Sequence, residues 1–444
     1  SHASGHDCAG NCQPTARIWR RDQRGPKLVE GYGYALNTGI AAYTLRLTFK
    51  ENYRMKAPQI TRLLTALVAV GSASAALAAE PTISLLDYKQ ATSAYQDAYL
   101  NGQFDAQSGN QDQTSYNLNL SVNYKQVFTS ADKNIKVSFS GSGSELRGPN
   151  ATDPVVSNYQ ATGAVTADMY FEPNSNTAFW YGKGQLGLLK GTEKPYTTAT
   201  LGVGYGRVVN VTPMAKAIRL VEALMERNLL KATPSIAAYQ AAAEVIAREP
   251  EYVSKYGSID YYMTWVQDIE KAFGITMDVK SAIKSYDVLS RETISSRKSG
   301  WLVRAGVGAV LSNYDGTTGK PALEVGAEYH QPIDNKTQFS NEALLTSVID
   351  SGKNSYHLTN LATLTYQVSD RVDWENSWLL DQVNNQSAPN VTSNTLGSTF
   401  RYYISNSLSF TVTASLSKLE DGISNNGNDE VNKRLQMGLT YRLK

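Results

Sequence analysis

The sequence contains little of what many proteins use for cross-links, metal sites or membrane-spanning helices. Its only two cysteines, Cys8 and Cys12, lie at the start of 444 residues, so the rest of the chain can form no disulfide bond. Two cysteines separated by three residues and preceded by two of the four histidines make too weak a pattern to indicate a metal site. We expect no metal and no cofactor. No apolar run reaches the roughly 18 to 20 residues of a membrane-spanning helix.

Basic charge is concentrated before residue 80. Residues 1–79 contain 10 Lys and Arg against 4 Asp and Glu, whereas residues 80–444 contain 32 against 36. The larger part of the chain is therefore slightly acidic, and we expect no nucleic-acid partner. The sequence is rich in tyrosine, with 27 residues. Tyrosine is common in the aromatic belts of membrane proteins, although a tyrosine-rich β-sandwich has a similar composition.

Residues 55–79 have the three parts of a secretory signal peptide. Two basic residues precede an apolar core at 63–70, and small residues with Ala76 and Ala78 form an A-x-A cleavage site. This pattern predicts export. Residues 1–54 precede the signal and show no periodic apolar face, so we interpret them as a non-native, disordered upstream extension.

From about residue 98 the chain repeats one pattern, eight to twelve alternating apolar and polar residues followed by a polar turn. A period of two places each set of residues on its own face of a strand. Fourteen strands are predicted, near residues 98–108, 115–127, 134–144, 158–171, 178–190, 196–209, 299–313, 321–331, 337–349, 355–368, 371–381, 392–403, 407–418 and 431–443.

The length and spacing of these strands favour a transmembrane barrel over a soluble sandwich. The strands are long, their apolar faces often end in aromatic residues, and the chain carries an export signal. Short turns alternate with longer connections, as expected for a barrel with both termini in the periplasm. The prediction is an all-β antiparallel transmembrane barrel built from residues 80–211 and 299–444.

The alternation also predicts which side chains face lipid and which face the lumen. Lipid offers no hydrogen-bond partners, so apolar residues should face outward and charged residues inward. The expected lipid-facing residues are Trp374, Trp378, Phe410, Val412, Leu439 and Tyr441. The expected lumen-facing charges are Arg304, Glu324, Glu328, Asp373, Glu375, Arg401, Arg434 and Arg442. They could form two walls of opposite sign, or they could pair with one another.

Residues 212–298 lose the period of two and read as a helical insertion between the sixth and seventh strands. Thr212–Pro213 and Thr233–Pro234 each resemble a helix start, and Pro250 should end the second helix. A third helix is predicted near 258–273. The strand count places this insertion in the periplasm, and a plug folded into the lumen is the alternative.

The alternating strands resemble the bacterial outer-membrane β-barrel superfamily, which includes porin-like proteins; no specific family can be matched. The final strand alternates Leu435, Met437, Leu439, Tyr441 and Leu443, like the C-terminal signal that the assembly machinery of these barrels reads. The usual signal ends on an aromatic residue, whereas this chain ends on lysine. The resemblance implies an outer-membrane location, contact with the bilayer and assembly by that machinery.

Two motifs suggest chemistry that the wider pattern does not support. Ser355, His357 and Asn360 include residue types of a hydrolase triad, but neighbours in one strand form a poor triad. The alternating glycines in 201–207 lack the helix that a phosphate-binding loop requires. We interpret them as places where side chains pack or the strand bends, and we expect no enzymatic activity.

The predicted function is a porin-like channel for small polar solutes or ions. The alternative is a structural or assembly barrel whose insertion, 212–298, docks a periplasmic protein. Ordinary porins turn around in a few residues, so an insertion of this length requires an explanation.

Overall fold

The computed structural model describes residues 83–443, with gaps at 90–92, 174–176, 315, 351–354, 385–388, 406, 424–425 and 427–429. The predicted extension (1–54) and signal peptide (55–79) lie outside the described residues. No helix among the described residues is long and apolar enough to cross a membrane.

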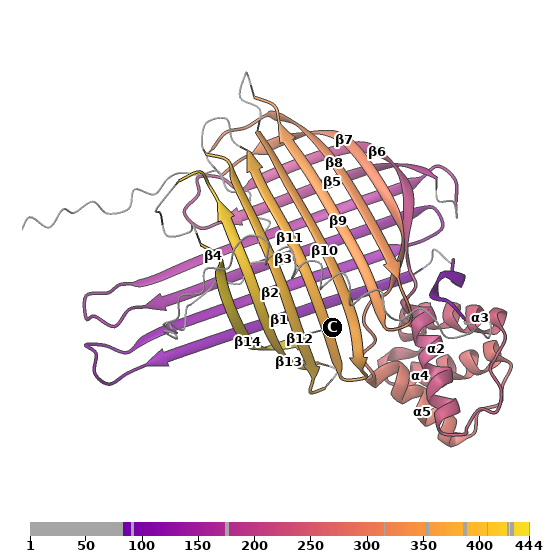
Figure 1. The fold of residues 1–444 in the computed structure, drawn as a ribbon. Coiled ribbons are helices and arrows are strands. Elements are labelled where there is room, and N and C mark those ends of the chain that lie inside the picture. Colours follow the sequence, from indigo (N-terminus) through magenta and orange to yellow (C-terminus); the bar gives the residue numbers. More distant parts are fainter. Residues whose placement is uncertain are drawn as a thin grey trace, which may run out of the picture. The chain divides into compact units, whose positions relative to one another are not determined.

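Fourteen antiparallel strands of this described part close into a barrel (Figure 1). Each strand pairs with the next one in sequence, and β1 pairs with β14 to complete the wall. The strands are β1 (Ser93–Gln107), β2 (Ser115–Thr129), β3 (Lys133–Arg147), β4 (Val155–Tyr170), β5 (Ala178–Leu189), β6 (Tyr196–Asn210), β7 (Lys298–Ser312), β8 (Lys320–Pro332), β9 (Thr337–Val348), β10 (Ser355–Ser369), β11 (Val372–Asn384), β12 (Val391–Tyr403), β13 (Leu408–Glu420) and β14 (Asn432–Arg442). The predicted fold class, with helices between the sixth and seventh strands, is confirmed.

The segment before the barrel differs from the prediction. β1 starts at Ser93 rather than near residue 98, because its first residues pair with the end of β2 despite their weak alternation. Residues 83–89, which lie within the predicted barrel segment 80–211, contain the short 3-10 helix η2 (Leu85–Asp87). Leu85 and Tyr88 belong to the core of the helical insertion instead.

The barrel wall separates polar from apolar side chains. Asp168 and Glu324 are buried on the interior face, whereas Leu201, Val203 and Val307 are among the most exposed apolar side chains of the described chain. This distribution is the reverse of that in a soluble domain. It is stable when lipid surrounds the barrel, because lipid solvates apolar side chains and excludes hydrogen-bonding ones.

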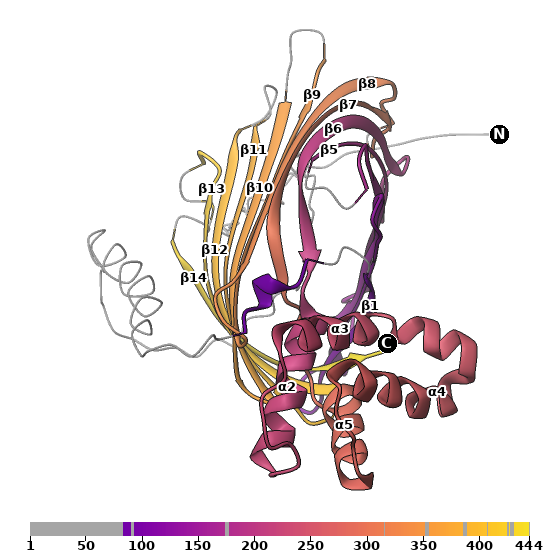
Figure 2. The same ribbon diagram turned by 90° about the vertical axis from the view of Figure 1, so that its right-hand side faces the viewer.

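Four helices connect β6 to β7: α2 (Thr212–Glu226), α3 (Ile236–Ala247), α4 (Glu249–Phe273) and α5 (Val279–Arg291). They pack against one another (Figure 2) around a core in which Leu220, Trp265 and Ile269 are fully buried. The insertion thus has a conventional apolar interior of its own.

The helix starts differ from the predicted ones by one or two residues. Val211, not Thr212, is the N-cap of α2, and it makes no side-chain cap hydrogen bond. Ser235, not Thr233, caps α3, because its Oγ accepts a hydrogen bond from the N–H of Ala238. The two Thr–Pro pairs therefore predicted correctly that a helix begins in each region, but the predicted N-cap residue was wrong in both.

The insertion also contains more helix than predicted. α3 ends at Ala247, and Pro250 lies in the first turn of α4. α4 continues across a kink at Gly257, whose φ is 81°, and then covers the predicted third helix at 258–273. α5 was not predicted.

The two ends of the insertion run side by side where they join the barrel. The N–H of Val211 donates to the carbonyl of Arg297 at 2.8 Å. Arg297 is fully buried, and its Nη2 donates to the carbonyl of Lys336 in the β8–β9 turn at 2.8 Å. Arg219 of α2 lies 2.8 Å from the carboxylate of Asp370 in the β10–β11 turn. We call this end of the barrel, where the short turns lie, the insertion end.

Candidate functional site

Aromatic rings packed against glycines fill part of the barrel interior. Phe179 and Tyr181 of β5 are fully buried beside Gly204 and Gly202 of β6. A Cβ atom at Gly202 would lie 2.5 Å from Cε1 of Tyr181, and one at Gly204 would lie 2.6 Å from Cε2 of Phe179. The alternating glycines of this strand therefore make room for the rings.

Ion pairs cross the interior next to these rings. Nζ of Lys136 in β3 lies 2.7 Å from Oε2 of Glu328 in β8. Nζ of Lys183 in β5 lies 2.7 Å from Oε2 of Glu324, also in β8. At least two strands separate the partners along the barrel wall. Their side chains therefore meet through the interior rather than along the wall.

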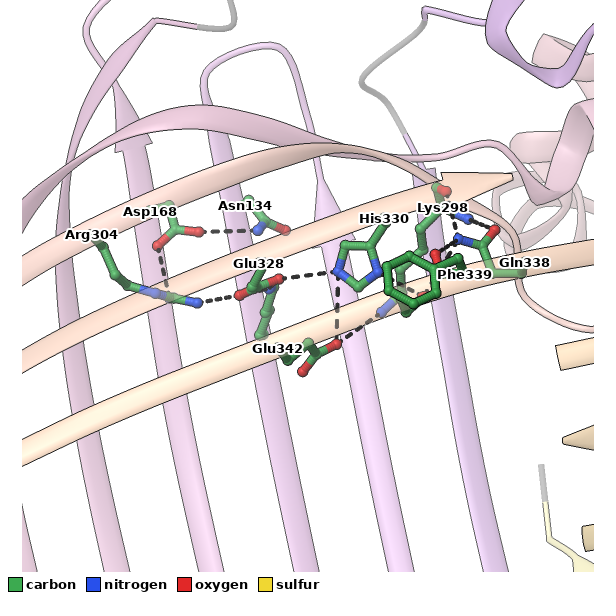
Figure 3. Close-up of polar contacts among 11 residues, drawn as sticks. Asn134, Asp168, Lys298, Arg304, Glu328, His330, Gln338, Phe339 and Glu342 are labelled. Carbon is green, nitrogen blue, oxygen red and sulfur yellow. Dashed lines mark hydrogen bonds and ion pairs between the residues drawn. The ribbon is translucent and has the colours of Figure 1, made fainter. Parts of the chain in front are cut away.

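Arg304 of β7 connects these ion pairs to Asp168 on β4 (Figure 3). Its guanidinium pairs with Glu328 and lies 3.8 Å from Oδ1 of Asp168 in β4. Nδ2 of Asn134 donates to the other oxygen of Asp168 at 3.1 Å. We call Lys136, Lys183, Asp168, Arg304, Glu324 and Glu328 the ion-pair cluster.

The ion-pair cluster mixes charges of both signs on each side, because Asp168 of β4 lies between the two lysine strands and Arg304 of β7 lies beside β8. β8 supplies Glu324 and Glu328, while β3 and β5 supply the lysines. The side chain of Lys136 is 24% exposed and that of Glu328 is 7% exposed. A pair this buried is stable when both partners stay charged and hydrogen-bonded, and removing one partner leaves a costly unpaired charge. The cluster therefore holds two walls together and narrows the space between them.

His330 extends the charged region toward the insertion end (Figure 3). Its Nδ1 lies 2.9 Å from Oγ of Ser340 on β9. Its Nε2 lies 3.6 Å from Glu328 and 3.8 Å from Glu342. Nζ of Lys298, the first residue of β7, lies 3.7 Å from Glu342.

The remaining predicted charges occupy the interior face of β11, β12 and β14. Asp373 and Arg401 are paired in register, and Glu375 lies one position along the same face. Arg434 pairs in register with Ser415. Arg442 lies 2.7 Å from the carboxylate of Asp97 on β1. The structure therefore gathers Arg304, Glu324 and Glu328 in one cluster and leaves the other five predicted charges outside it.

The six residues predicted to contact lipid lie on the opposite face of the wall. The register pairs Phe410 with Leu439 and Tyr441 with Leu100 of β1. Val412 is on the same face as Phe410. Trp374 and Trp378 are exposed, and their Nε1 atoms donate to Ser398 at 2.9 Å and Asn394 at 3.3 Å. The indole nitrogens thus find polar partners on an otherwise apolar surface.

Two cavities lie inside the barrel along β1 to β5. The larger, of about 570 Å³, is lined mainly by amide and hydroxyl side chains, with Arg401 and Lys190 as its charged members. Its lining continues around the wall from β1 through residues 436–440 of β14 to Thr399, Thr411 and Thr413 of β12 and β13. The second, of about 410 Å³, includes Lys183 of the ion-pair cluster in its lining.

The serine, histidine and asparagine considered for a hydrolase do not converge. His357 and Thr359 share the interior face, whereas Asn360 pairs with Ala343 and Leu380 on the exterior face. Nε2 of His357 instead lies 3.0 Å from Asp381 on the neighbouring strand.

Sequence reasoning missed the partners of the predicted charges. Lys136, Lys183, Asp168 and Glu342 were not singled out, because their contacts join strands far apart in the sequence. Each of them occupies one of the alternate positions of its strand whose side chains face the interior. A survey of every charged residue at such a position would have included all four, but it would not have shown which side chains contact each other.

No family model matches the sequence, and no curated protein matches it either. Similar solved structures include OmpTdeltaL8, an outer membrane protein of Vibrio cholerae, with 8% identity, TM-score 0.30 and coverage of 79% of this chain and 99% of that chain. Omp33 of Acinetobacter baumannii has 10% identity, TM-score 0.27 and coverage of 80% and 99%. The translocator domain of autotransporter NalP from Neisseria meningitidis has 7% identity, TM-score 0.27 and coverage of 87% and 96%. The closed wall, its apolar exterior and its polar interior identify the chain as a membrane-spanning β-barrel of fourteen strands.

Proposed function

We propose that the protein is a channel for small polar solutes or ions, with the ion-pair cluster as its narrow region. The observation that carries this proposal is the cavity of about 570 Å³ with amide and hydroxyl walls inside the barrel. Such walls replace the hydrogen bonds that a polar solute loses when it leaves water. Because the aromatic rings of β5 pack against the glycines of β6, the interior along β1 to β5 is left for a water path.

Selectivity in this proposal comes from charge and size together. A solute that passes between β3 and β8 meets Lys136 and Glu328. Paired charges of both signs favour neither cations nor anions strongly, so we expect weak ion selectivity. We also propose that the barrel acts without catalysis and that the assembly machinery recognises β14, whose Leu435, Leu439 and Tyr441 are exposed.

Planar-bilayer recording tests the channel directly. Purified protein refolded in detergent should produce discrete conductance steps, because single barrels insert one at a time. Heat-modifiable mobility on a gel verifies that the barrel is folded. Flat traces from folded protein would overturn the channel proposal.

A second candidate function uses the helical insertion as a docking module for a periplasmic protein. Ile259 and Met263 lie one turn apart on α4 and are 79% and 58% exposed. Val279 and Ile283 lie one turn apart on α5 and are 75% and 63% exposed. Exposed apolar residues at this spacing are typical of a face that a partner covers. The even number of strands before the insertion supports its periplasmic placement.

Deletion of residues 213–297 separates the two candidates. Because Asn210 of β6 and Lys298 of β7 remain and are paired in register, a short Gly/Ser turn can replace the insertion. If the insertion docks a partner, the truncated barrel should conduct but lose its cross-links to periplasmic proteins in cells. Unchanged cross-links would exclude the docking role.

A further inference from the structure

We propose that Glu328, His330 and Glu342 bind a divalent transition-metal ion, with Zn²⁺ as the best match. One ligand atom from each residue lies within 4.8 Å of the others. Glu328 and His330 alternate on β8 and therefore share a face, and Glu342 pairs with Glu328 across β8 and β9. Two hydrogen-bonded strands thus present three ligands from a rigid surface.

The histidine supplies the observation that points to a cation. His330 is 2% exposed, and its buried Nε2 has no hydrogen-bond partner among the described residues. The carboxylate oxygens nearest to it are 3.6 and 3.8 Å away. A proton on Nε2 would be too far from either oxygen for a normal hydrogen bond. A lone pair on Nε2 would face two negative groups.

A metal ion between the three groups would give Nε2 a partner and would compensate the charge of the two carboxylates. Zinc binds histidine nitrogen and carboxylate oxygen at about 2.0 to 2.2 Å, which places ligand atoms of a tetrahedral site about 3.4 Å apart. The distances from Nε2 to the two carboxylates, 3.6 and 3.8 Å, are close to this value, and all three ligand atoms lie within 4.8 Å of one another. Ser340, 2.9 Å from Nδ1, can accept the other ring proton and so leave Nε2 free to bind. Water would complete the coordination.

The site is accessible, and neighbouring cations limit how tightly it binds. The side chain of Glu342 is 45% exposed, so an ion can reach the three ligands from the side of Glu342. Lys136 and Arg304 also bind Glu328, and Lys298 lies 3.7 Å from Glu342. A carboxylate has about four lone-pair sites, so Glu328 can hold these partners and a metal together. The imidazole ligand favours zinc over calcium or magnesium.

Metal titration of the refolded full-length chain tests the site without reference to conductance. Calorimetry with Zn²⁺ and visible absorption with Co²⁺ should each show one ion per chain that His330→Gln and Glu342→Gln lose. The affinity loss should exceed the roughly 10- to 100-fold expected for Ser340→Ala, which removes only the outer-shell partner. His357→Gln is the matched control, since His357 already pairs with Asp381. It should bind like the wild type.

The outcomes separate this site from other metal-binding groups. Cobalt held by Cys8 or Cys12 would show thiolate charge-transfer absorption, whereas the proposed nitrogen and oxygen ligands would not. If His330→Gln fails to fold, Glu342→Gln still tests the site because its side chain is partly exposed. Equal uptake by the wild type and Glu342→Gln, or no uptake by folded wild type, would overturn the proposal.

Discussion

The barrel and the helical insertion solve the same folding problem with opposite arrangements of side chains. In the insertion, Trp265 and Leu220 are fully buried in an apolar core. In the barrel, Asp168 and Glu328 are buried inside, and Val203 is 62% exposed on the outside. Apolar side chains therefore lie inside the insertion, which water surrounds, and outside the barrel, which lipid surrounds.

This difference shows what stabilises each region. The insertion depends on burial of apolar surface, which water favours at roughly 25 cal/mol per Å². The barrel depends on its complete ring of strand pairing and on polar satisfaction inside, because lipid provides no hydrogen bonds. A substitution should therefore have different consequences in the two regions even when the chemical change is the same.

The largest effect is expected for Trp265→Ala in the core of the insertion. The indole is fully buried, and its Nε1 donates to the carbonyl of Val245 at 3.0 Å. Truncation should destabilise the insertion by about 3 to 5 kcal/mol through cavity formation. Denaturant titration of helical circular dichroism, with heat-modifiable mobility as a separate readout of the barrel, measures both regions. Ile259→Ala, at an exposed position of the same helix, should change little. Loss of the barrel together with the helices would contradict the independence of the two regions.

A charge on the outer wall should have the next largest effect. Val412 lies on the exterior face of β13, and an arginine near the membrane centre costs about 2 to 4 kcal/mol. Val412→Arg should therefore reduce folding into lipid vesicles. The control is Thr413→Arg, one residue along, because Thr413 lines the larger cavity and has room for a charged side chain. Equal folding yields for the two variants would show that this wall does not face lipid.

The same contrast explains how far the sequence could predict the fold. Period-two alternation identified the barrel because each strand has one lipid-facing and one interior face. α5 escaped notice because its buried stripe begins with Ser281 and Ser285, which hide the apolar period. Ser285 is satisfied by donating to the carbonyl of Ser281 at 2.8 Å. A periodicity based on hydrophobicity cannot recognise a buried serine whose partner is its own helix.

The candidate site was predictable only in part for a different reason. The alternation of side chains along β8 predicted that Glu324 and Glu328 face the interior. It does not determine which strands face each other across the barrel. That depends on barrel closure and stagger, which set Lys136 of β3 against β8. The cluster is therefore a property of the tertiary structure, whereas the faces are a property of the local sequence.

A paired substitution in the cluster should affect conductance more than stability. Lys136→Met combined with Glu328→Gln removes both partners, so no uncompensated charge remains from that pair, and Arg304 keeps Asp168 nearby. Replacing both partners of a buried pair is often close to neutral for stability. We expect larger single-channel currents in planar bilayers with a similar unfolding midpoint. Lys136→Met alone should fold less well, because it leaves Glu328 short of a partner. Unchanged current in the folded double variant would remove the cluster from the conducting path.

The smallest expected effect is a pH dependence confined to the insertion. Asp278 caps α5, since its Oδ1 accepts hydrogen bonds from Oγ of Ser281 at 2.6 Å and from the N–H of Ser281 at 2.8 Å. These bonds, chiefly the one from the hydroxyl, hold the pKa of Asp278 below its ordinary value. In the unfolded chain the pKa of an aspartate carboxyl is about 3.9. The carboxylate therefore stabilises α5 fully above that value, and the contribution is lost as pH falls through the lower pKa of the folded state.

Asp278→Asn separates the cap from its charge, because asparagine also caps helices but does not titrate. Hydrogen exchange of the peptide covering 279–285, corrected for intrinsic rates, measures the local stability of α5. Wild-type protection should remain constant from neutral pH to about pH 5 and decline toward about pH 3, whereas the asparagine variant should show a flatter profile. Strand peptides such as 409–416 provide the internal reference in each sample. If both proteins lose α5 protection equally on acidification, another group controls the helix, and the local origin assigned to Asp278 is wrong.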